Sequence, residues 1–128
     1  MRSGGDVDTL SFQNFYVNHI LDRAKFYESL SFEMNGRHIK HTLLLHHNLT
    51  SALFLKSLVK KFQSEGWDAI NAIEAYKDPI YQRIPKVIPA GESLIWSLAK
   101  KSGKFENILR YPAEDSRYEK GAMNRLGL

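Results

Sequence analysis

Apolar residues recur with the period of an α-helix in three parts of this chain. The predicted helices, each with the glycine that ends it, are Ser11–Met34 before Gly36, Thr50 or Ser51 to Glu65 before Gly66, and Gly91–Lys101 before Gly103. Thr9 or Ser11 is the predicted N-cap of the first helix. The apolar residues predicted to line the inner face of the second helix are Leu55, Leu58, Val59 and Phe62.

The stretch between the first two helices has a different pattern. Thr42–His46 contains three successive leucines, and a polar triplet of His46, His47 and Asn48 follows them. A continuous apolar run predicts a strand that is buried on both faces, as in a parallel sheet. After the second helix, Trp67–Ala72 predicts another short strand, and Ile73–Tyr76 predicts a helical turn.

The order of these elements predicts an α/β fold. Residues 41–77 form a strand–helix–strand unit, for which a right-handed parallel βαβ arrangement is the simplest interpretation. Residues 1–40 supply a helix and a loop, and residues 78–128 a proline-punctuated segment, a helix and a polar tail. Two strands cannot bury themselves, so we interpret the 128 residues as one incomplete α/β domain, or as a chain that takes the missing strands from a partner.

Composition and charge narrow the classes of function that the chain can have. A hydrophobic content of 43% and an aromatic content of 12% suit a packed domain, and the absence of cysteine excludes disulfides and thiolate chemistry. A net charge of +4 from scattered Lys and Arg does not favour nucleic-acid binding. No apolar run reaches the ~18–20 residues that span a bilayer, which predicts no membrane segment. The start of the sequence lacks an apolar signal region, which predicts a cytoplasmic location for the chain as written.

The histidines are the candidate catalytic and metal-binding residues. His46 and His47 follow the predicted strand, at the edge where α/β folds place their active sites. Successive strand residues point to opposite faces, and no metal-binding spacing is present, so we predict no metal site from this chain alone. One of the pair is a catalytic candidate, and a histidine that is merely hydrogen-bonded or exposed is the alternative. His19 is predicted to be structural or solvent-facing on its helix, and His38 and His41 are predicted to be loop residues.

Thr42–Asn48, the helix after it and the pair Gly66-Trp67 resemble the polysaccharide deacetylase family, the NodB-homology carbohydrate esterases. The tail is similar through Pro89–Trp96 and Leu109–Pro112. The resemblance implies a distorted (β/α) barrel that hydrolyses acetyl groups of N- or O-acetylated sugars with a divalent, zinc-type metal, a carboxylate base and a histidine acid. It assigns the general acid to His46 and implies that Leu44, His47 and Asn48 lie at the substrate pocket.

The chain lacks other parts of that family's pattern. The Thr-Phe-Asp-Asp strand, the His-Ser/Thr-x-x-x-His segment and the Arg-Pro-Pro segment are absent, and only Asn14-Phe15 stands where the family has Asp-Trp. The chain therefore resembles a C-terminal part that holds the acid without the metal ligands or base, and we predict no activity from it alone. The alternatives are self-association through strand edges and a non-catalytic sugar-binding role. The aromatic residues available for stacking on sugars, or for core packing instead, are Tyr16, Trp67, Tyr76, Tyr81 and Trp96.

Overall fold

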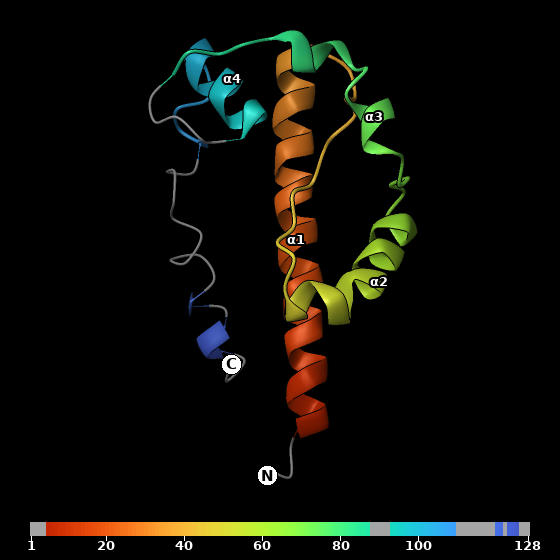
Figure 1. Ribbon diagram of the computed structural model, residues 1–128. Coiled ribbons are helices and arrows are strands. Elements are labelled where there is room, and N and C mark those ends of the chain that lie inside the picture. Colours follow the sequence, from red (N-terminus) through yellow and green to blue (C-terminus); the bar gives the residue numbers. More distant parts are fainter. Residues whose placement is uncertain (1–4, 88–92, 110–119, 122, 126–128) are drawn as a thin grey trace. The chain divides into compact units, whose positions relative to one another are not determined.

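The structure, a computed structural model, describes residues 5–87, 93–109, 120–121 and 123–125, with side chains from Thr9 onward. All regular structure in these residues is helical (Figure 1). The elements are α1 (Gly5–Asn35), α2 (Leu49–Ser64), α3 (Ala72–Ala75), the 3-10 helix η1 (Pro79–Gln82) and α4 (Leu94–Ser102). Pro89–Glu92 and Arg110–Pro112, which contribute to the family resemblance, lie outside the described residues.

The prediction of an α/β fold with two parallel strands is wrong for the described residues. Thr42–His46 and residues 67–71 have no regular secondary structure, and Ala72 begins α3. A strand needs a hydrogen-bonded neighbour, and neither segment pairs with the other. Nor is the leucine run buried, because Leu43 is 55% exposed and Leu44 is 91% exposed. The described part of the chain therefore shows no incomplete (β/α) barrel.

The predicted helix ends are confirmed, whereas the predicted starts are not. Gly36, Gly66 and Gly103 follow α1, α2 and α4 with φ values of 67°, 89° and 68°, the left-handed region that glycine adopts without strain. Thr9 and Ser11 lie inside α1, since no glycine or proline after Gly5 interrupts the helix. The first residue of the predicted third helix, Gly91, lies outside the described residues.

The chain divides into two compact units, each described here by itself. Unit 1 comprises Met1–Arg23, Leu44–Ala69 and Asp115–Leu128, and unit 2 comprises Ala24–Leu43 and Ile70–Glu114. Among the described residues of unit 1, the buried apolar side chains are Val17 and Leu21 from α1 and Phe54 and Leu58 from α2.

The inner face of α2 differs from the predicted one. The ring of Phe54 lies 6.0 Å from that of Phe12 and 5.9 Å from that of Tyr16, measured between centroids. Phe54 therefore takes the place predicted for Leu55, which is 45% exposed, and Val59 is 36% exposed. Phe54 and the correctly predicted Leu58 are four residues apart and make a narrow buried stripe.

Unit 2 has a separate apolar core. Its buried members come from α1, the following loop, η1 and α4, and they are Leu30, Ile39, Ile80, Ile95, Leu98 and Ala99. Ser93 caps α4, because its hydroxyl oxygen accepts a hydrogen bond of 3.1 Å from the backbone N–H of Trp96. This core packs the loop after α1 against η1.

Candidate functional site

The residues that the family resemblance assigns to a site lie on the surface of unit 1. His46, His47 and Asn48 are exposed, and Leu44 is almost completely exposed. Asn48 is the N-cap of α2, the position predicted for Thr50 or Ser51, and its Oδ1 atom accepts a hydrogen bond of 2.9 Å from the backbone N–H of Ser51. The predicted residues thus lie on an exposed stretch of chain, and no described residue covers most of the Leu44 side chain.

The described residues do not fit the zinc-type metal that the resemblance implies. No group of three or more His, Asp or Glu side chains among them could hold a metal ion. His19 stacks on Phe15 in α1 with 5.5 Å between ring centroids, which is the structural one of the two roles predicted for it. A metal ion for deacetylation would therefore need ligands from outside the described residues.

Two other histidines belong to a polar cluster that the sequence did not predict. Nδ1 of His38 faces Oε1 of Glu28, and Nε2 of His41 faces Oε2 of the same carboxylate, each within hydrogen-bonding distance. The ring of His38 also lies against that of Phe32, with 4.7 Å between centroids. His38 and His41 are loop residues, as predicted. One carboxylate on α1 thus fixes two imidazole rings of the following loop.

Asp78 is the most strongly held acidic group in the described part of the chain. Arg37 donates two hydrogen bonds to its carboxylate, at 3.0 and 2.7 Å, and the backbone N–H groups of Lys40 and Ile80 donate two more, at 3.0 and 2.9 Å. The side chain is 5% exposed. The Arg37 guanidinium holds the pKa of Asp78 well below its usual range, against the opposing effect of burial, and the two backbone donors lower it further.

Tyr81 adds a further tie to the same loop. Its hydroxyl group donates a hydrogen bond of 2.6 Å to the backbone carbonyl of Lys40 and lies 3.3 Å from Oγ1 of Thr42. Burial raises the pKa of the Tyr81 hydroxyl, and the hydrogen bond with Thr42 acts in the opposite direction. The loop is therefore held by side chains up to Thr42, whereas the next two residues, Leu43 and Leu44, are exposed.

Local sequence signals could have found only part of these groups. Asp78 precedes Pro79 at the start of η1, and an acidic residue before a proline is a known helix-start pattern. Its partner Arg37 is 41 residues away in the sequence, and Glu28 lies 10 and 13 residues from its two histidines. No helical or strand spacing connects such pairs, so the sequence alone does not indicate them.

The aromatic residues considered for sugar stacking make contacts within the protein. Tyr16 lies against Phe54, Trp67 against Phe62, and Tyr76 against Tyr81, with centroid distances of 5.9, 5.4 and 5.1 Å. Trp96 is 4% exposed. Of this set, Tyr76 has an exposed side chain, with 57% of its surface accessible.

Comparisons with known proteins identify none that is similar to this chain. Among the described helices, none combines the length and the apolar character that crossing a bilayer requires, in agreement with the sequence prediction. A scan against models of known protein families and searches of curated proteins and of solved structures found no match to this chain.

Proposed function

We propose that the chain contributes the general acid of a polysaccharide deacetylase, and that another polypeptide segment contributes the metal ligands and the base. The reaction is hydrolysis of an acetyl group on an N- or O-acetylated sugar, which yields acetate and a free amine or hydroxyl. His46, as an imidazolium, donates its proton to the departing nitrogen or oxygen. Leu44 contacts the acetyl methyl group, and His47 and Asn48 line the pocket beside it.

The observation that supports this proposal most is the exposure of His46 next to uncovered leucines. Full burial of a leucine side chain is worth about 1.5–3 kcal/mol, so a chain that leaves Leu43 and Leu44 exposed gains stability when another surface covers them. A surface that does so also comes to lie beside His46. The arrangement suits a histidine that completes its site only when a partner segment is present.

The charge around this segment supports a partner rich in carboxylates. Between Met34 and Ser64 the sequence has no Asp or Glu. Of its five basic residues, Arg37 pairs with Asp78 and Lys61 with Glu65, which leaves Lys40, Lys56 and Lys60 without an ion pair in the described part of the chain. A symmetric pairing of two copies through this segment would bring like charges together. A segment that brings the carboxylate base and metal ligands is complementary to it.

Acetate release from N-acetylglucosamine oligomers tests the proposal. We expect none above background from the 128-residue chain with added Zn²⁺, and metal-dependent release once the chain is joined to the polypeptide encoded directly upstream in its gene. In the joined protein, His46→Gln should lower kcat by a factor of about 10²–10⁴, because general acid catalysis contributes that much. The variant His38→Gln replaces a loop histidine outside the proposed site, so it is the matched control and should retain most activity. Equal losses in the two variants, or release by the isolated chain, would contradict the proposal.

Self-association is the second candidate, favoured by the same exposed leucines. Sedimentation of the chain over a range of concentrations separates the two candidates. A dimer that Leu44→Ser abolishes would support self-association, and a monomer at all concentrations would leave the deacetylase proposal as the better account.

A further inference from the structure

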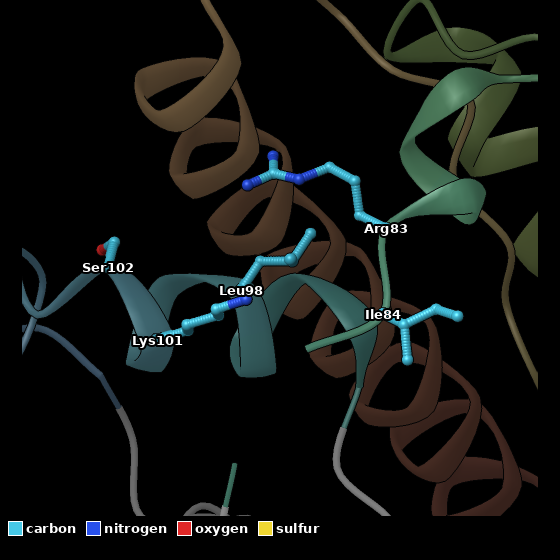
Figure 2. Close-up of a pocket in the computed structure, with 5 residues that line it drawn as sticks. All are labelled: Arg83, Ile84, Leu98, Lys101 and Ser102. Carbon is cyan, nitrogen blue, oxygen red and sulfur yellow. The ribbon is translucent and has the colours of Figure 1, made fainter. Parts of the chain in front are cut away.

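A hollow on unit 2 is lined by two cationic side chains over an apolar floor. Its volume is about 420 Å³, and the lining residues are Arg83, Ile84, Leu98, Lys101 and Ser102. Figure 2 shows the Arg83 and Lys101 side chains on opposite sides of Leu98 in that view. Leu98 is 4% exposed and belongs to the core, whereas Ile84 is 79% exposed. The hollow contains none of the residues in the proposed function and is independent of it.

Both cations of the hollow lack a carboxylate partner within the described part of the chain. Three other basic residues of unit 2 have one, since Arg37 pairs with Asp78, Lys77 with Glu74, and Lys100 with Glu106. The neighbours Lys100 and Lys101 thus differ, because Lys100 is neutralised at 3.1 Å and Lys101 is not. Two uncompensated positive charges at one hollow favour a bound anion.

The guanidinium of Arg83 is held in place by neutral groups. Its Nη1 atom donates a hydrogen bond of 3.2 Å to Oδ1 of Asn35, and Nδ2 of Asn35 donates one of 2.7 Å to the backbone carbonyl of Ser31. Ser31 is completely buried. The amide therefore orients the guanidinium without neutralising it, and the remaining N–H groups are available to a ligand.

We propose that this hollow binds a small organic anion, a carboxylate or a phosphate monoester attached to an apolar body. The planar fork of Arg83 suits two oxygens of one anionic group, and the ammonium of Lys101 adds a second charge-assisted hydrogen bond. The Ser102 hydroxyl donates its proton to the backbone carbonyl of Ala99 at 2.7 Å, so the two cations are the donors. Leu98 and Ile84 contact the apolar body.

Amide NMR titrations of the full chain with phenyl phosphate, benzoate, inorganic phosphate and phenol test this assignment. We expect phenyl phosphate or benzoate to shift the amide signals around Arg83, Lys101 and Ser102, inorganic phosphate to bind more weakly, and phenol to leave them unchanged. Whichever of phenyl phosphate and benzoate binds more tightly identifies the preferred anionic group. Equal shifts with phenol would indicate an apolar patch only and would overturn the proposal, as would the absence of shifts with both aromatic anions.

Variants separate a specific site from general charge attraction. Arg83→Gln and Lys101→Gln should each weaken binding about tenfold or more, because each removes a hydrogen bond between charged groups. Lys100→Gln removes one positive charge beside the hollow and should leave the affinity within about twofold. Arg83→Lys keeps the positive charge but lacks the planar guanidinium. Its affinity should lie between that of Arg83→Gln and that of Lys100→Gln. Equal weakening in all the variants would overturn the proposal. Unchanged amide spectra outside the hollow establish that each variant is folded.

Discussion

Replacement of Asp78 by asparagine is the sharpest test of how the loop after α1 is held. The carboxylate accepts four hydrogen bonds, two from Arg37 and one each from the N–H groups of Lys40 and Ile80. In Asp78→Asn, an NH₂ group replaces one of the two acceptor oxygens. One backbone N–H and one guanidinium N–H then face a donor and lose their hydrogen bonds.

The size of the effect follows from these contacts. A hydrogen bond to a charged group contributes about 1.5–3 kcal/mol, and a buried N–H left unpaired adds its desolvation penalty of about 1–3 kcal/mol. The guanidinium side is discounted, because the Arg37 side chain is 44% exposed and water solvates it after the change. We therefore expect Asp78→Asn to lower the free energy of unfolding by about 3 kcal/mol.

Urea unfolding followed by tryptophan fluorescence measures this loss. In a Trp67→Phe background, the signal comes from Trp96, which lies in unit 2 and is 4% exposed. Glu74→Gln is the matched control, since it breaks the exposed ion pair with Lys77 and should cost less than about 0.5 kcal/mol. If Asp78→Asn costs no more than Glu74→Gln, the reasoning that Asp78 holds the loop is refuted.

Three further predictions follow from the same structure. The pKa of Asp78 is lower in the folded chain than its unfolded value of about 3.9, so its stabilisation is complete above about pH 5 and declines as the pH falls towards the folded pKa; urea titrations should show this decline in the wild type and not in Asp78→Asn. Leu30→Ala should lower the unfolding free energy by about 2–5 kcal/mol because Leu30 is 2% exposed in the unit 2 core, whereas Leu44→Ala should change it by less than about 0.5 kcal/mol; similar losses would disprove the assignment of Leu44 to the surface. Asn48→Ala should cost about 1 kcal/mol by removing the N-cap of α2, and Asn48→Ser should restore most of it; no loss in the alanine variant would contradict the capping role.

Local signals in the sequence predicted the parts of the fold that depend on a few adjacent residues. Glycines that end helices need only a backbone conformation that other residues adopt with strain, and all three were found where predicted. The N-cap of α2 depends on one side chain three residues before its donor, so Asn48 was recognisable as a cap candidate. The prediction of Thr50 or Ser51 as the cap was therefore wrong, and the pocket position of Asn48 is what the family resemblance implies.

The parts that depend on distant partners could not be predicted. The Thr42–His46 run has the composition of a buried strand, but strand formation requires a paired neighbour, and the described residues contain none. The contact of Arg37 with Asp78 and that of Glu28 with His38 and His41 join residues that no periodic pattern relates. For the proposed site, the family resemblance indicates His46 and its neighbours, and under our proposal a partner segment supplies the rest of the pocket.

Hydrogen exchange of the amides of residues 43–46 tests most directly whether the His46 segment is unpaired in this chain. Because these amides make no backbone hydrogen bond in the described structure, we predict exchange within about tenfold of the rate of an unfolded peptide. The α2 amides around Leu58 should exchange far more slowly in the same sample. Protection of residues 43–46 comparable to that of Leu58 would show a paired, covered segment and would contradict the account.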